Sequence, residues 1–529
     1  MTPTILESNL KKILEESFKE EIDLFSISIP PPHIEFDAST NFAFIISKKT
    51  KKSVEEIFHK IREVLSRLGF ELELVSGFIN IKFPDRIYEE YINTLNKNEK
   101  LFVKDRYRGK KVIIEFVSAN PTGPLHLASA SGATLGNSLA NLMKELGFDV
   151  FKEYYVNDCG NQVELLGQSL MKRFLGQEPP ENGYHGEYLI EIAKKLPSDA
   201  SKWIVEEFSD FAIKEILQSQ KDDLQKLGVE FDRWFFESEL HKEKLPDTVL
   251  KILEEKNMVE IKDGAKWLKM DNSEDKERVL VKSNGAKTYF LNDLAYHKTK
   301  YDRGFDWIID IWGADHHGYI PRMKAGIKAL GYDEKKFTVI IHQLVSIKKG
   351  QEILKMSKRA GRFHTLRDLI EEVSPDGVKF FFTMRNPNTH LIFDVELAKK
   401  QTNENPLYYV QYAHARIASI FEKAKDIIDV NKISSFKNYK LSNDDKKILK
   451  KIFWFEKILN QSLKDLSPHH ITTYLIELAG DFHSYYEKNR IINEKDLTTT
   501  SARLFILKGI KNTLKKGLDI IGVTAPQKM

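Results

Sequence analysis

The sequence contains few of the features that mark disulfide-bonded, secreted or membrane-anchored proteins. It has one cysteine, Cys159, so no disulfide can form within the chain, and we expect a reducing compartment such as the cytoplasm. No stretch approaches the ~18 uncharged apolar residues of a membrane-spanning helix, so no membrane association is expected. The first residues show no basic segment followed by an apolar run, which predicts no secretory signal.

The bulk composition is that of a globular protein with several domains. Hydrophobic residues make up 41% and charged residues 30% of the 529 residues, and this length predicts two to four separate cores. The net charge is only +4, but residues 431–529 hold 18 lysines and arginines against 10 acidic residues. This excess favours a polyanionic partner, although a solvated helical surface is an equally good interpretation.

Residues 1–100 have the pattern of a small α+β module. From Ser53 onward, "SVEEIFHKIREVLSRLG" places its apolar residues on one helical stripe and ends at Gly69. Two alternating segments, "ELELV" and "FINIKF", then predict strands on either side of Gly77.

A Rossmann-type, doubly wound α/β domain is predicted for residues 105–395. The nearly continuous apolar run "VIIEFV" (112–117) is typical of a buried parallel strand, and a glycine-containing turn and a helix from 126 to 146 follow it. Further strands are expected at "TYFL", "WIIDIWG" and "FTVIIHQLV", with a more polar insertion at about 150–280. From 400 to 529 the pattern is helical and predicts a bundle.

The turn "PTGPLHLAS" has the chemistry of a phosphate site. Gly123 and its small neighbours would let a ligand approach the backbone, and the following helix presents free N–H groups to an anion. His126 could donate a hydrogen bond to phosphate oxygens. The alternative is that this histidine is only a local cap or a surface residue.

A second basic motif is "ILKMSKRAG", residues 353–361. Lys355 and Lys358 flank Met356 and Ser357, and two lysines at this spacing can neutralise a triphosphate or a leaving pyrophosphate. The alternative is a solvated basic loop.

Two acids point to a cationic substrate. Glu115 lies inside an apolar strand, where a charge is costly unless it is paired. Asp293 begins another apolar segment, four residues after Tyr289. Two carboxylates and a tyrosine would suit a guanidinium, which pairs with carboxylates and stacks on aromatic rings. The alternative is that Glu115 pairs with an arginine of the chain itself.

The histidine turn and the Lys-Met-Ser-Lys motif together resemble the class I aminoacyl-tRNA synthetases. Within that class the sequence is similar to arginyl-tRNA synthetases along nearly its full length, through "EFVSANPTGPLH", "EYYVNDCGNQ", "YHGEYL", "LGVEFDRWFFES", "WGADHHGYIPR", "NENPLYYVQYAHAR" and "LDIIGVTAPQKM". The resemblance implies ATP-dependent ligation of L-arginine to arginine tRNA, with Mg²⁺ sharing the phosphate charge and with bound tRNA required for activation. One cysteine gives no ligand cluster, and the adjacent histidines of "DHHG" have no suitably spaced partners, so we expect no metal site. We also expect a monomer.

The resemblance also assigns roles to the matching residues. His126, Lys355 and Lys358 would be catalytic through the ATP phosphates and the leaving pyrophosphate. Arginine would be bound by Glu115, Ser118, Asn120, Tyr289, Asp293, Asp315 and His316. ATP would be bound by Pro121, Gly123, His126, Ala128, Ser129, Met356, Ser357 and Lys358. Tyr408, Tyr409 and Tyr412 are candidates for stacking on tRNA bases, although helical spacing makes at least one of them a core residue.

The first motif departs from the family pattern, which has glycine and histidine where this chain has Ala128 and Ser129. The methyl group of Ala128 takes space near the adenine, and the missing imidazole removes a possible phosphate donor. Losing such a donor can cost ~3 kcal/mol of transition-state stabilisation. Two rival functions follow: a non-catalytic tRNA-binding paralogue, or an enzyme that adenylylates a small metabolite without tRNA.

Overall fold

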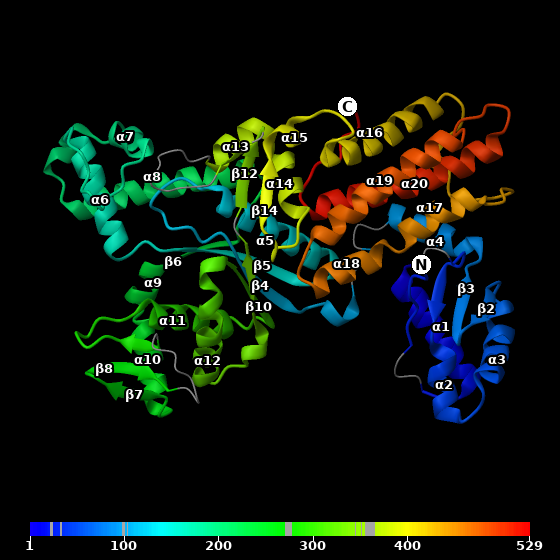
Figure 1. The fold of residues 1–529 in the computed structure, drawn as a ribbon, viewed down its shortest axis with the longest axis horizontal. Coiled ribbons are helices and arrows are strands. Elements are labelled where there is room, and N and C mark those ends of the chain that lie inside the picture. Colours follow the sequence, from blue (N-terminus) through cyan, green and yellow to red (C-terminus); the bar gives the residue numbers. More distant parts are fainter. Residues whose placement is uncertain are drawn as a thin grey trace.

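The structure is a computed structural model that describes residues 1–21, 25–31, 34–97, 101–102, 104–269, 278–343, 345–350, 352–354 and 365–529. A parallel sheet lies at its centre, between helical excursions on one side and the N-terminal module and C-terminal helices on the other (Figure 1). No helix in the described part of the chain is long and apolar enough to cross a membrane.

The N-terminal module has the predicted α+β pattern. Its strands form an antiparallel sheet in the order β1-β3-β2, and its elements are α1 (Pro3–Phe18), β1 (Ala38–Thr40), α2 (Phe42–Thr50), α3 (Val54–Ser66), β2 (Glu71–Val75), β3 (Phe78–Lys82) and α4 (Asp85–Lys97). The Ser53 side chain caps α3 by accepting a hydrogen bond from the N–H of Glu56. Gly77 makes the β2–β3 turn at a φ of 82°, which a residue with a side chain adopts at a cost. The helix and both strands predicted here are confirmed.

The central sheet is parallel and has the strand order β11-β10-β4-β5-β6. Its strands are β4 (Lys111–Glu115), β5 (Asp149–Val156), β6 (Arg233–Phe236), β10 (Trp307–Gly313) and β11 (Phe337–His342), and α5 (Leu127–Leu146) follows β4. The chain runs from β4 to β6 in one direction and adds β10 and β11 on the other side. The order therefore reverses between β4 and β10, which is where ligands of open α/β sheets bind. The predicted doubly wound fold is confirmed.

Two excursions leave this sheet. Between β5 and β6 the chain forms α6 (Asn161–Phe174), α7 (Glu187–Ala193) and α8 (Val205–Lys226). Between β6 and β10 it forms α9 (Glu237–Lys242), α10 (Leu245–Glu255), β7 (Val259–Lys262), β8 (Ala265–Leu268), β9 (Val279–Val281) and α11 (Tyr289–Asp302). The expected insertion at 150–280 therefore contains β5 and β6, two strands of the central sheet.

The strand predicted at "TYFL" is wrong. Thr288 is the N-cap of α11, its hydroxyl accepts a hydrogen bond from the N–H of Leu291, and Tyr289 opens the helix. A run of four apolar residues is too short for its periodicity to separate strand from helix. The segment "FTVIIHQLV" also differs from the expectation of one strand: β11 ends at His342, and a second strand, β12 (Val345–Lys349), begins in another sheet.

The elements after β11 connect the sheet to the C-terminal helices. After β12 they are β13 (Glu352–Leu354), α13 (Leu366–Val373), α14 (Pro375–Thr383), β14 (Leu391–Asp394) and α15 (Val395–Lys399). Helix α12 (Ile320–Leu330) lies earlier, between β10 and β11. The small sheet has the order β13-β12-β14. Lys355, Met356, Ser357 and Lys358, which carry the second predicted motif, lie outside the described residues.

The C-terminal part is helical, as predicted. It contains α16 (Pro406–Ala424), α17 (Asn443–Phe453), α18 (Phe455–Lys464), α19 (His469–Lys488) and α20 (Leu497–Ile520). The N-terminal module packs against it, near α17 and α18 in Figure 1. Phe453 makes edge contacts with Phe83 and Tyr91, and the indole N–H of Trp454 donates to the carbonyl of Asp37.

Candidate active site

Three carboxylates lie side by side where the central sheet is most buried. Glu115 on β4 is in register with Glu153 on β5 and with Asp310 on β10. Glu153 and Asp310 are fully buried, and Glu115 is 8% exposed. Three adjacent acids cannot all be ionised here unless cations compensate them.

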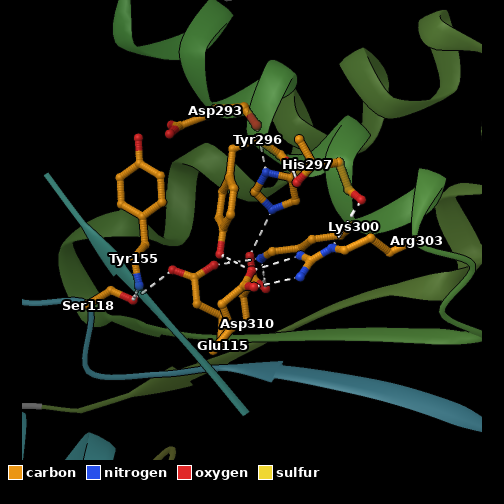
Figure 2. Close-up of polar contacts among 11 residues, drawn as sticks. Glu115, Ser118, Tyr155, Asp293, Tyr296, His297, Lys300, Arg303 and Asp310 are labelled. Carbon is orange, nitrogen blue, oxygen red and sulfur yellow. Dashed lines mark hydrogen bonds and ion pairs between the residues drawn. The ribbon is translucent and has the colours of Figure 1, made fainter. Parts of the chain in front are cut away.

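A single helix, α11, and the residue after it supply those cations, as Figure 2 shows. Lys300 Nζ lies 2.6 Å from Glu115 Oε2 and 2.7 Å from Asp310 Oδ1, and Arg303 makes two hydrogen bonds to Glu153. Burial by itself would lower the pKa of Lys300, but the carboxylates of Asp310 and Glu115 hold that pKa above its ordinary value. The lysine is therefore charged, and its charge offsets those of the acids.

Glu115 is thus compensated by the protein itself. Its second oxygen, Oε1, accepts a hydrogen bond from the hydroxyl of Ser118, which in turn accepts from the N–H of Tyr155. The structure therefore shows the internal pairing of Glu115 that the sequence left open, with a lysine rather than an arginine as the partner. A part for Glu115 and Ser118 in arginine binding stays a prediction, through polar contacts rather than a free charge.

Asp293 has a different environment. It lines a pocket of about 780 Å³, and the pocket also contains three other predicted arginine ligands, Tyr289, Asp315 and His316. Tyr319 Oη donates to Asp293 Oδ2 at 2.6 Å. Among the described residues, no lysine or arginine forms an ion pair with this carboxylate. Lys282 and Arg322 also line this pocket, so the carboxylate of Asp293 lies among charged groups of both signs.

The pKa of Asp293 indicates that a bound cation would stabilise its ionised form. Burial raises the pKa of its carboxyl to about 6, and the nearby carboxylates of Glu115 and Glu237 act in the same direction. The phenol of Tyr155 points toward Asp293 in Figure 2, and its pKa is raised by burial, Glu237 and Asp293. An incoming guanidinium would relieve this concentration of negative charge.

His297 links the pocket to the buried acids. Its Nδ1 lies 2.7 Å from the backbone carbonyl of Asp293, and its Nε2 lies 2.8 Å from Asp310 Oδ2. Sequence reasoning missed His297 and Lys300. His297 is four residues and Lys300 seven residues after Asp293, a spacing that places all three on one face of a helix. Interpreting the segment as a helix would have predicted that they lie together.

The predicted phosphate turn lies at the start of α5, beside β4. Gln220 donates from its side chain to the carbonyl of Gly123, Pro121 is buried, and His126 is the N-cap residue of the helix. Ser129 is 6% exposed, whereas Ala128 is half-buried. Asn120 is exposed and donates to Gln162 Oε1 at 2.8 Å, so the structure does not place it in the pocket lining that contains Asp293.

The segment that follows the Lys-Met-Ser-Lys motif returns to this turn. The N–H of Leu366 donates to the carbonyl of Leu125 at 2.8 Å, and Thr365 forms a backbone bridge with His126. The motif itself cannot be described, but the chain that leaves it lies against the helix start at which the ATP phosphates are predicted.

The three tyrosines of α16 have two different environments. Tyr408 and Tyr412 stack with ring centroids 6.0 Å apart and an angle of 7° between the rings, and Arg416 lies over Tyr412. Tyr409 packs against the hydrophobic core and against His483. All three tyrosines are half-buried, and Tyr412 also stacks on His483. Tyr409 is the one that packs against the core, as the helical spacing indicated for at least one of the three.

Family comparisons cover almost all of the chain. Residues 4–83 match the arginyl tRNA synthetase N-terminal domain, 91–413 match the class I (R) tRNA synthetase catalytic domain, and 410–529 match the DALR anticodon binding domain. The arginine–tRNA ligase of Elusimicrobium minutum is 47% identical over 98% of this chain and 99% of its own length. That of Thermotoga petrophila is 40% identical over both full lengths. The Thermus thermophilus arginyl-tRNA synthetase structure has the same fold, with a TM-score of 0.77 at 20% identity over both full chains.

The parallel sheet and the catalytic-domain match define a class I aminoacyl-tRNA synthetase. Within that class, sequence identities of 40–47% to arginine–tRNA ligases over the full length show which family the chain belongs to. The chain belongs to the arginyl-tRNA synthetase family. The alternative of a non-catalytic tRNA-binding paralogue is not supported, and the N-terminal and DALR matches disfavour an enzyme that acts on small metabolites alone.

Proposed function

We propose that this protein ligates L-arginine to its cognate tRNA in an ATP-dependent reaction. The observation that carries the proposal is the carboxylate of Asp293, which lines a pocket with Tyr289 and, among the described residues, forms no ion pair with a lysine or an arginine. A guanidinium can pair with this acid and stack on the exposed ring of Tyr289. Asp315 and His316, which line the same pocket, would complete the arginine site.

The reaction proceeds through arginyl adenylate. A carboxylate oxygen of arginine attacks the α-phosphorus of ATP, the bond from that phosphorus to the bridging oxygen breaks, and pyrophosphate leaves. The terminal ribose of the tRNA then attacks the adenylate through its 2′-hydroxyl and releases AMP. No side chain has to act as a nucleophile, so positioning and electrostatics carry the first step. His126 and the free N–H groups of α5 would face the phosphates, with Lys355 and Lys358 adding positive charge.

Other parts of the proposal concern the setting of the reaction. Mg²⁺ would arrive on the phosphates of ATP. The described residues contain no group of three His, Cys, Asp or Glu side chains that could hold an ion, and no step is assigned to one. Tyr408 and Tyr412 would stack on tRNA bases, and the basic helical end would attract the tRNA backbone. We propose a cytoplasmic location, which the single cysteine supports, and a monomeric state.

The direct test is aminoacylation with radiolabelled arginine and ATP, with and without total tRNA. We expect labelled arginine to become acid-precipitable only when both ATP and tRNA are present. ATP-dependent adenylate formation on another small molecule, without tRNA, would contradict the proposal. Binding of tRNA without any charging would point instead to a protein that has lost its chemistry.

The pKa of Asp293 predicts how arginine use depends on pH. This pKa, about 6, lies above the ordinary value for aspartate, so the free enzyme loses the negative charge as the pH falls through about 6. We expect kcat/KM for arginine to fall about tenfold per pH unit below 6 and to be level above 7. At saturating arginine the fall should shift to lower pH, because the bound guanidinium favours the carboxylate. A kcat/KM for arginine that is level down to pH 5 would show that this carboxylate does not meet the guanidinium.

A further inference from the structure

His342 occupies a position that the motif analysis did not single out. It is the last residue of β11, in register with Gly313 on β10, so it lies at the carboxyl edge of the sheet where ligands of this fold bind. The residues that follow Gly313 carry Asp315 and His316. His342 is therefore on the ligand-binding side of the sheet and not in its interior.

The imidazole of His342 faces the beginning of α5. A methyl group at Gly132 would lie 3.8 Å from His342 Nε2 and 3.8 Å from the backbone nitrogen of Val117. Gly132 is on the second turn of α5, four residues after Ala128 and three after Ser129. The absence of a side chain at Gly132 thus leaves the ring beside the helix turn at which phosphates are expected.

His342 also lies close enough to His126 for the two rings to interact electrostatically. Burial lowers the pKa of His342, and the imidazole of His126 adds to this effect. His342 is neutral at pH 7, so it can donate one hydrogen bond to an anionic oxygen without the cost of burying a second positive charge. Two imidazoles from different elements, the end of β11 and the N-cap of α5, then converge on one end of one helix.

We propose that His342 is a second imidazole of the ATP site and donates from Nε2 to a phosphate oxygen of ATP. The inference rests on the proposed function and adds a residue to it. It also explains how the chain can have Ser129 where the family pattern has histidine. A hydrogen-bond donor from β11 would supply the phosphate contact that the missing histidine would make. Ser129 is 6% exposed, whereas His342 is half-buried and lies at the end of β11, on a different element.

The test compares two variants of nearly equal bulk, His342→Gln, which keeps an N–H donor, and His342→Met, which has none. The readouts are kcat and the KM values for ATP and arginine in tRNA aminoacylation. For His342→Met we expect kcat to fall by about a hundredfold, the usual effect of losing one donor to developing phosphate charge, with KM for arginine within about threefold of wild type. His342→Gln should recover at least about tenfold of that loss.

The control variant is His185→Ala. His185 is exposed, and its ring forms a hydrogen bond with the carbonyl of Pro180, away from the residues assigned to the ATP and arginine sites, so we expect wild-type kinetics. Equal losses in the Gln and Met variants would assign His342 a packing role and overturn the proposal, as would a kcat within threefold of wild type in both. If the wild-type protein charges no tRNA with arginine, it is the proposed function that fails, and that outcome is visible before any variant is made.

Discussion

Replacing Asp293 with asparagine is expected to lower kcat/KM for arginine by roughly two to three orders of magnitude, the scale of removing one partner of a buried ion pair. The variant keeps the shape of the side chain and an oxygen that can accept from Tyr319, but it leaves the guanidinium without a counter-charge. The KM for ATP should change little. Steady-state aminoacylation at varied arginine and fixed saturating ATP and tRNA measures the effect.

The same variant should be at least as stable as the wild type. Because burial raises the pKa of Asp293, the ionised carboxylate costs folding free energy at pH 7, and an amide removes that cost. The matched control is Asp302→Asn at the exposed end of the same helix, where the carboxylate accepts from Lys298 and Tyr332. We expect its kcat/KM to be within twofold of wild type. If Asp293→Asn retains arginine kcat/KM within tenfold, Asp293 is not the guanidinium partner.

The second large effect concerns stability rather than binding. Lys300→Met should lower the free energy of unfolding of the catalytic part by about 3 to 5 kcal/mol, because two buried carboxylates, Glu115 and Asp310, lose their shared cation. Urea unfolding followed by circular dichroism measures the change. Lys298→Met removes only the pair of this half-buried lysine with the exposed Asp302 on the same helix, and we expect a change under about 1 kcal/mol.

A combined variant separates loss of charge compensation from loss of packing. Lys300→Met together with Glu115→Gln and Asp310→Asn removes the acids along with the lysine, so no buried charge is left unpaired at these positions. We expect it to recover more than half of the stability lost by Lys300→Met. An equally unstable triple variant would mean that the bulk of the lysine side chain, and not its charge, holds α11 on the sheet.

Most of the fold could be predicted because its signals are local. The strand at β4, the turn at Gly123 and the helix that begins after His126 are adjacent in the sequence, and each has its own pattern. The strand order could not be predicted, because a parallel strand pairs with segments far away in the chain. For the same reason the sheet strands β5 and β6 were absorbed into an expected insertion.

The site was predicted in part, and the reason lies in α11. Asp293 and Tyr289 were recognised as residue types that suit a guanidinium, and the structure brings them into one pocket. The compensation of Glu115 could not be predicted, because its partner Lys300 is 185 positions later and becomes a neighbour only through the pairing of β4 with β10. Reading "TYFL" as a strand also hid the helix face that carries Asp293, His297 and Lys300.

The central claim is that one uncompensated carboxylate selects a positively charged guanidinium, and a comparison of arginine with citrulline tests it most directly. Citrulline has nearly the same shape but no charge. In aminoacylation with both labelled amino acids, we expect the wild-type protein to prefer arginine by at least about a thousandfold in kcat/KM, and Asp293→Asn to lose most of that preference. Similar charging of both amino acids by the wild type, or an unchanged preference in Asp293→Asn, would contradict the claim.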